Sequence, residues 1–287
     1  MRKKGIILAF TSSLIYGFIP ILSIYAYAEG SDPFSLVFLN TLIVMPLIVV
    51  IAYLKKASLK TSWEELSKIA LVSVVNLLTN ILLSISYVYI GAGTATSLHF
   101  FYPVLVVLII RIIYGTKISN KQRIALFIGV VGVLLFMDVY DVNRIIGVTT
   151  ALASGLTYAL YIVWIEKMQL TKINSARLIF YLSLTSIVYM LLFNLLSIDM
   201  FTINLDTSIV GYFYILIIGI LIYVFAMAFV VTGTKLLGSV TISMISLFEP
   251  VSSVVFGFVL LNEHVSMMNI IGCTLIIISI IKLMKNK

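Results

Sequence analysis

The residue best suited to chemistry in this sequence is Glu249, a carboxylate well inside a long apolar stretch. The stretch begins near Gly238, and Glu249 lies about halfway along it, directly before Pro250. A membrane-spanning helix needs about 20 apolar residues, so we expect Glu249 close to the middle of a bilayer. An ionised acid is costly there, and such acids usually line a pathway or a site. The alternative is an acid held neutral, or hydrogen-bonded to a neighbouring helix, for packing alone. We favour a functional role.

Other candidates are polar and aromatic residues that interrupt apolar stretches. The full set of predicted contacts for a substrate or a proton is Glu249, His99, Tyr102, Asn76, Asn80, Tyr16, Tyr158 and Tyr223. Asn76 and Asn80 are four residues apart, and His99 and Tyr102 are three apart, so each pair shares one face of a helix. Histidine titrates near neutral pH, which suits proton exchange, although a bond from His99 to a neighbouring carbonyl is an equal alternative. For all of them the competing interpretation is packing, since polar bonds between membrane helices contribute only about 0.6 kcal/mol on average.

No catalytic or metal-binding constellation accompanies these residues. The chain has one cysteine, Cys273, and two histidines. A single cysteine excludes a multi-cysteine metal site and an internal disulfide framework. We therefore expect no cofactor and no metal.

The composition indicates the class of protein. Hydrophobic residues make up 62% of the 287 residues and charged residues 10%, whereas soluble domains carry about 25% charged residues. This balance predicts an all-α integral membrane protein, because helices satisfy their own backbone hydrogen bonds in lipid.

Ten apolar runs must position the candidate residues. Their approximate bounds are 5–28, 33–54, 66–90, 94–114, 121–140, 145–167, 174–197, 208–233, 238–260 and 267–284. The third and fourth runs are joined only by Gly91-Ala92-Gly93. We place the break between the eighth and ninth runs at Thr234–Leu237. The sequence thus predicts ten transmembrane helices.

Charge orients these helices. With the N-terminus inside, 18 of the 19 Lys and Arg residues fall on the inner side, and Arg144 alone falls outside. The outer loops carry acids, namely Glu29, Asp32, Asp138, Asp141, Asp199, Asp206 and Glu263. Because Lys and Arg concentrate in cytoplasmic loops, we predict a multi-pass plasma-membrane protein with both termini cytoplasmic. The net charge of +8 then reflects topology and contact with anionic lipid, not nucleic acid.

The two halves of the chain repeat. Gly5–Tyr16 aligns with Gly147–Tyr158, and Gly91–Val104 aligns with Gly238–Val251, which places Pro103 on Pro250. We therefore divide the chain into a first repeat, 1–141, and a second repeat, 142–287. Five helices in each repeat make the second inverted, and inverted repeats with a midplane site are common in secondary transporters. The predicted helix hinges are Gly91, Pro103, Gly238 and Pro250.

These motifs resemble the EamA-like branch of the drug/metabolite transporter superfamily. The second repeat carries the family pattern most fully, as Gly238, then Glu249-Pro250, then Leu261-Asn262-Glu263, then Gly272. The first repeat has Tyr102 where Glu249 falls and Thr116 where Glu263 falls. The resemblance covers nearly the whole chain and implies two five-helix repeats and transport. It does not identify the substrate, since relatives move amino acids, other metabolites or drugs.

The expected function is secondary active export of a small metabolite or drug-like compound by alternating access, coupled to protons. The export direction rests on the resemblance. The alternative is an importer or facilitator of a small cationic or zwitterionic metabolite. An intramembrane enzyme is disfavoured, because no acid pair or His-nucleophile pair is evident, and a passive channel would favour rings of like residues from symmetric subunits. The expected partners are a small-molecule substrate and the lipid bilayer, and the sequence leaves a homodimer open.

Overall fold

The computed structural model describes residues 2–135, 145–195, 201–261 and 265–284, and within these ranges the chain is helical without any β-strand. The first half contains α1 (Arg2–Ala28), α2 (Pro33–Leu54), α3 (Trp63–Ile90), α4 (Ala92–His99), α5 (Tyr102–Ile112) and α6 (Asn120–Leu134). The second half contains α7 (Ile145–Lys167), the 3-10 turn η2 (Leu170–Lys172), α8 (Ser175–Asn194), α9 (Ile209–Gly219), the π-helix η4 (Ile220–Ala226), α10 (Met227–Leu237), α11 (Ser239–Ile245), α12 (Phe248–Leu261) and α13 (Met267–Met284).

Short polar residues fix where several helices begin. Asp32 accepts hydrogen bonds from the first turn of α2, Ser62 from α3 and Ser208 from α9. Ser119 forms a capping box with Gln122 at the start of α6. Such side chains satisfy backbone N–H groups that have no partner inside the helix. Loop residues thus set the ends of the apolar helices.

The protein is a multi-pass membrane protein. Eight of the helical stretches in the described residues are long and apolar enough to cross a membrane: Arg2–Ala28, Pro33–Leu54, Trp63–Ile90, Thr94–Ile112, Ile145–Lys167, Ser175–Asn194, Ile209–Leu237 and Ser239–Leu260. A shorter apolar helix covers Met267–Leu283, and α6 ends next to residues outside the described ranges. The all-α membrane class is confirmed, and the count of ten spans stays a prediction.

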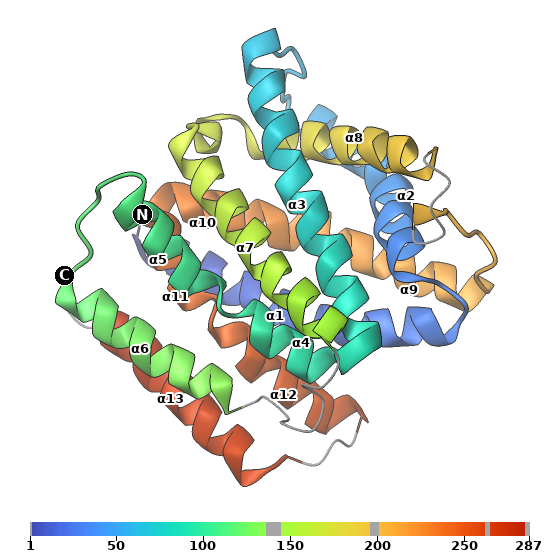
Figure 1. Cartoon of the computed structure of the whole chain (residues 1–287). Coiled ribbons are helices and arrows are strands. Elements are labelled where there is room, and N and C mark those ends of the chain that lie inside the picture. The colour runs from blue at the N-terminus through green and yellow to red at the C-terminus, as the bar shows by residue number, and fades with distance from the viewer. Residues whose placement is uncertain (1, 136–144, 196–200, 262–264, 285–287) are drawn as a thin grey trace.

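The two halves pack on each other in a reciprocal pattern (Figure 1). Helix α1, the first of its half, packs against α9, α10 and α12 of the other half. Its counterpart α7 packs in the same way against α3, α4 and α5. Helices α2 and α8 pair with each other, as do α6 and α13. This is the contact pattern of two repeats related by a pseudo-two-fold axis, which inverted repeats produce.

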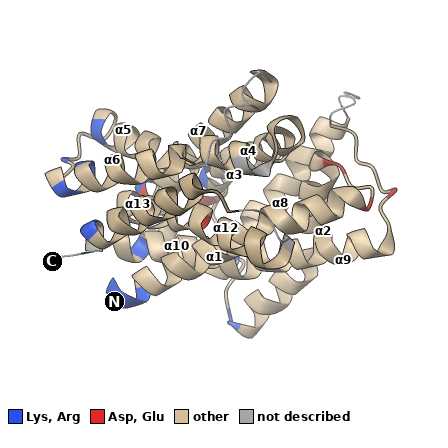
Figure 2. Cartoon of the chain, turned by 90° about the horizontal axis from the view of Figure 1, so that it is seen from below, with Lys and Arg blue, Asp and Glu red and all other residues tan. Residues whose placement is uncertain are grey.

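Charge separates the two ends of the bundle. Figure 2 shows most of the visible Lys and Arg positions at the end that holds the start of α1 and the end of α13, with several Asp and Glu positions at the opposite end. We call these the basic end and the acidic end. Contacts support this grouping: Lys167 lies 5.0 Å from the ring centroid of Tyr114 at the basic end, whereas Glu29 bonds Ser208 at the acidic end.

Each half contains one membrane-length stretch that is broken in the middle. In the first half α4 ends at His99 and α5 begins at Tyr102, and in the second half α11 ends at Ile245 and α12 begins at Phe248. Both prolines follow the break directly, so Pro103 and Pro250 lie in the first turn of a new helix. There the missing N–H costs no hydrogen bond.

Glycines open both broken stretches with the same backbone conformation. Gly91 has φ 74° and ψ 158°, and Gly238 has φ 81° and ψ 159°. This region is essentially restricted to glycine. The predicted break at Thr234–Leu237 was wrong, because α10 continues to Leu237 and the chain turns at Gly238 alone. Residues 234–237 carry no conformational restriction that would stop a helix, whereas the positive φ requires the glycine.

Candidate functional site

Glu249 lies in the first turn of α12, directly after the break. It sits deep inside the protein, yet its side chain is partly exposed, so its exposed surface faces the interior of the bundle. Its backbone N–H donates to the Ser246 carbonyl at 3.0 Å, which satisfies the oxygen that Pro250 leaves without its helical donor. Among the described residues, no hydrogen bond or ion pair reaches the Glu249 carboxylate.

Four tyrosines surround Glu249. Tyr16, Tyr87, Tyr102 and Tyr158 all lie close enough to interact electrostatically with its carboxylate. They come from α1, α3, α5 and α7, so both repeats contribute. The structure therefore brings together the acid and three of the predicted tyrosines, and adds Tyr87. Tyr87 is not among the residues predicted from the sequence.

Two of these tyrosines, Tyr102 and Tyr158, form an aromatic cluster with His99 and Tyr161. The rings of Tyr102 and Tyr158 meet edge to face with centroids 4.7 Å apart, and His99 lies 5.3 Å from Tyr102 and 5.4 Å from Tyr158. Tyr161 stacks on Tyr158 at 5.8 Å. Aromatic contacts of this kind fix ring orientation and contribute about 0.5–1.5 kcal/mol each beyond burial. The cluster thus forms a rigid wall beside Glu249.

His99 is held by Ser154 on α7. The Ser154 hydroxyl donates to the Ala151 carbonyl at 2.6 Å, so it accepts at its oxygen from His99 Nδ1–H, 2.9 Å away. The neutral ring then carries its proton on Nδ1 and presents Nε2 as an acceptor. This arrangement fits a positioning role for His99 within the aromatic wall as well as it fits proton exchange.

Two tyrosine hydroxyls of the cluster are buried without a hydrogen-bond partner among the described residues. Within the described residues, Tyr102 and Tyr161 make no hydrogen bond through their buried hydroxyls. Ser246 lies near the Tyr102 hydroxyl but outside bonding geometry, and donates to the Ile242 carbonyl instead. Buried polar groups without partners are rare and call for an explanation.

A close helix contact fixes the acid against α1. A Cβ on Gly17 would lie 2.8 Å from the Glu249 carbonyl oxygen and would overlap the Ser252 hydroxyl. Ser252 donates to the Ser13 carbonyl at 3.0 Å across the same contact. Glycine at this position lets the two backbones touch, so Tyr16 reaches Glu249 from the adjacent position on α1.

Tyr223 lies at the edge of this region, in the π-helix η4. Its hydroxyl is 2.6 Å from that of Thr41 on α2, and it lies within electrostatic reach of Tyr16 and Tyr161. Single π-turns inside α-helices often mark functional sites. Tyr223 was among the residues predicted from the sequence, which gave no signal for its Thr41 partner or for the π-helix.

The two predicted amides lie on α3, near the contact with α7. Asn80 donates to the Asn76 carbonyl at 3.0 Å, and Thr79 between them donates to Thr157 at 2.8 Å. Asn76 is buried and Asn80 is half-buried. Because Thr79 bonds Thr157, the residue before Tyr158, the two amides lie beside α7. Tyr87 is the α3 side chain that lies near Glu249.

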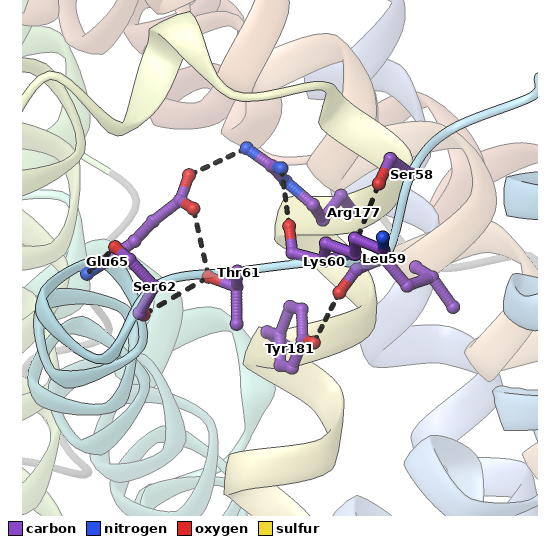
Figure 3. A network of polar contacts seen from close by, with 8 residues as sticks. All are labelled: Ser58, Leu59, Lys60, Thr61, Ser62, Glu65, Arg177 and Tyr181. Carbon is purple, nitrogen blue, oxygen red and sulfur yellow. Dashed lines mark hydrogen bonds and ion pairs between the residues drawn. The ribbon is translucent and has the colours of Figure 1, made fainter.

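At the basic end, a polar clasp joins the loop before α3 to α8 (Figure 3). Arg177 pairs with Glu65 at 2.7 Å and also donates to the Lys60 carbonyl at 2.8 Å. The Tyr181 hydroxyl donates to the Leu59 carbonyl at 2.6 Å. The Arg177–Glu65 pair is mostly buried, with side-chain exposures of 21% and 23%. These bonds hold the two repeats together at this end.

Comparisons with known proteins identify the family and the fold. The model of a family described as the EamA-like transporter family matches residues 3–137 and 145–284. A solved structure described as "Crystal structure of protein" superposes with a TM-score of 0.81 at 15% identity, covering 99% of this chain and 98% of its own. At that identity the similarity concerns the fold alone. A search of curated proteins finds no match.

Proposed function

Because the chain belongs to the EamA-like transporter family, a family of membrane transporters, we propose that it is a secondary active transporter that exports a small metabolite or drug-like compound. We further propose that the protein lies in the plasma membrane with both termini cytoplasmic, and that proton movement drives transport. The basic end is then the cytoplasmic end. It acts as a transporter, without catalysing a covalent reaction.

The observation that carries this proposal is the Glu249 carboxylate, which lies between the two repeats with no bonded partner among the described residues. The absence of a bonded partner disfavours the alternative of a packing acid that is hydrogen-bonded to a neighbouring helix. An acid that faces interior space can instead bind a proton at one time and a substrate group at another. Exchange between the two couples their movements without further machinery.

The architecture supports alternating access in this proposal. Each repeat has one stretch that is broken near the aromatic cluster and Glu249, α4–α5 in the first repeat and α11–α12 in the second. Each stretch also begins after a glycine with positive φ. Discontinuous helices at the repeat interface are a common feature of secondary transporters, and rocking of the repeats exposes the site to either side. The predicted hinges at Gly91, Pro103, Gly238 and Pro250 have this role in the proposal.

Proteoliposomes with a trapped pH indicator test the function. We expect solutes from a panel of amines, amino acids and drug-like cations to move protons against their own direction of movement. Empty liposomes are the control. A solute that equilibrates through the protein with no proton movement, and no response to an imposed pH gradient, would contradict coupled transport and leave the facilitator alternative.

A further inference from the structure

A cavity of about 360 Å³ lies at the basic end, beside the clasp of Arg177 and Glu65 (Figure 3). The start of α3, in the first half of the chain, forms one side of it. The η2 turn and the start of α8, in the second half, form the other side. A volume in this range is typical of small-molecule sites. The polar and charged residues of its wall include Ser62, Glu64, Glu65, Lys68, Lys172 and Arg177.

The charges of this wall leave one cation without an acidic partner. Each acid in the described part of the wall already has a cationic partner, in the pairs Glu64 with Lys68 at 2.6 Å and Glu65 with Arg177 at 2.7 Å. Lys172 Nζ donates to the neutral side-chain oxygen of Gln169 at 2.7 Å, and among the described residues it pairs with no acid. The charge that remains for a ligand is therefore positive.

Helices α3 and α8 both begin beside this cavity. The Ser62 hydroxyl caps α3 by accepting from the Glu65 N–H at 3.1 Å, and the Asn174 side chain caps α8 by accepting from the Ala176 N–H at 2.9 Å. Each cap satisfies one of the first four N–H groups, which have no partner inside their helix. The start of a helix carries a partial positive charge and binds anions, including phosphate groups. The two helix starts thus add to the charge of Lys172.

Exposed aromatic and apolar side chains lie at the same end of the bundle. Trp63, which directly follows Ser62, is 83% exposed, and Tyr53 and Leu54 at the end of α2 are 81% and 71% exposed. Tryptophan and tyrosine are enriched where membrane helices meet the headgroup region. Basic pockets between helices on the cytoplasmic side of a membrane bind lipid headgroups. The cavity therefore lies at the depth where lipid phosphates are found.

We propose that this cavity is an anion site that takes a phosphate group, carried by a phospholipid headgroup or by a soluble phosphate compound. Lys172 supplies positive charge, and the starts of α3 and α8 supply N–H donors. Because these groups come from both halves of the chain, a bound phosphate joins the halves beside the clasp. The wall of the cavity contains neither Glu249 nor the aromatic cluster, so the inference does not depend on the proposed transport.

Thermal unfolding in a nonionic detergent tests this site without any transport measurement. The full chain is titrated with phosphatidylglycerol, with phosphatidylcholine as the lipid without net charge, and with inorganic phosphate at constant ionic strength. A ligand that binds only the folded protein raises the apparent melting temperature with its concentration, which gives an apparent Kd. We expect phosphatidylglycerol or inorganic phosphate to stabilise the protein more than phosphatidylcholine does. Stabilisation by phosphatidylglycerol alone assigns the site to a lipid headgroup, and stabilisation by inorganic phosphate assigns it to soluble phosphates.

Two variants with opposite expected effects localise the binding. Lys172→Gln should weaken it by about two- to fivefold, the equivalent of one solvent-exposed ion pair. Glu64→Gln leaves Lys68 without its acidic partner, so it should tighten binding by a similar factor. Lys117→Gln is the matched control and should change nothing, because Lys117 is an exposed loop lysine at the same end, as Lys172 is, but lies outside the cavity wall.

Equal losses of affinity in Lys172→Gln and Lys117→Gln would show that the basic surface as a whole attracts the anion, and would overturn the site. Stabilisation by none of the phosphate ligands, or binding that Lys172→Gln leaves unchanged, would overturn it as well. If Lys172→Gln does not fold, Glu64→Gln decides alone, because Glu64 is an exposed residue, and weaker or unchanged binding in that variant would contradict the proposal.

Discussion

The two broken stretches share one backbone design and differ in chemistry. Gly91 and Gly238 adopt nearly the same positive φ, and Pro103 and Pro250 both begin the second segment. Yet the position before the proline is Tyr102 in one and Glu249 in the other. The first repeat therefore contributes an aromatic wall, and the second contributes the charge that this wall surrounds. The two repeats thus share the breaks in their helices and differ in the side chains beside them.

Helices α1 and α7, which pack against the two broken stretches, also differ in how closely they do so. Gly17 of α1 contacts the backbone of α12 at Glu249, and Gly155 of α7 contacts the backbone of α4 at His99. A Cβ at Gly155 would meet one oxygen, the His99 carbonyl at 2.8 Å, whereas a Cβ at Gly17 would meet three atoms within 3.0 Å. The contact of α1 with the stretch that carries Glu249 is therefore tighter than the contact of α7 with the stretch that carries His99.

The largest expected effect is that of Gly17→Ala. Overpacking lowers stability by about 1–3 kcal/mol. Two of the three atoms that the new Cβ would meet are backbone atoms, so we expect Gly17→Ala to lose stability near the upper limit. Gly155→Ala should lose less. Apparent melting temperatures in detergent measure both. Ser252→Ala added to Gly17→Ala removes one overlap and should restore part of the loss. Equal losses at the two glycines would show that the two contacts are equivalent.

Gly91→Ala and Gly238→Ala should each cost about 1–3 kcal/mol, because alanine is strained at this φ and ψ. The nearly identical dihedral angles predict losses that agree with each other within measurement error. The same melting experiment decides this. A loss confined to Gly238→Ala would mean that only the second break keeps this geometry.

Tyr102→Phe separates stability from transport. Removing a buried hydroxyl without a partner should leave the melting temperature unchanged or raise it, by an amount equivalent to about 1 kcal/mol. If this hydroxyl contacts the substrate, transport in proteoliposomes falls although the protein is no less stable. A variant that loses stability instead would show that the hydroxyl has a structural partner.

The smallest expected effect is that of Tyr181→Phe in the clasp. It removes one hydrogen bond, to the Leu59 carbonyl, worth about 0.5–1.5 kcal/mol. The apparent melting temperature in detergent measures this loss. An unchanged melting temperature would contradict a stabilising role for this bond in the clasp.

The sequence indicated Pro103 and Pro250 as hinges because proline restricts the backbone locally, and in the structure each lies in the first turn after a helix break. Their role as hinges stays a prediction. The sequence did not indicate η4, since the residues from Ile220 to Ala226 are apolar and carry no local signal for a π-turn. Tertiary contacts set it: Gly219 lies against the Asn40 carbonyl, and Tyr223 bonds Thr41. Tyr87 was missed as a neighbour of Glu249 for a related reason. Helix periodicity gives the face on which a residue lies, and only packing between repeats gives what that face meets.

The most direct test of the central claim is gradient-driven transport by Glu249→Gln. Glutamine keeps the size and much of the hydrogen bonding of glutamate but stays neutral. We predict normal insertion, yield and size-exclusion behaviour. Because charge-assisted hydrogen bonds contribute about 1.5–3 kcal/mol, we also predict a loss of transport of about ten- to hundredfold. Transport that is unchanged in rate and in pH dependence would contradict the account and make Glu249 a packing residue.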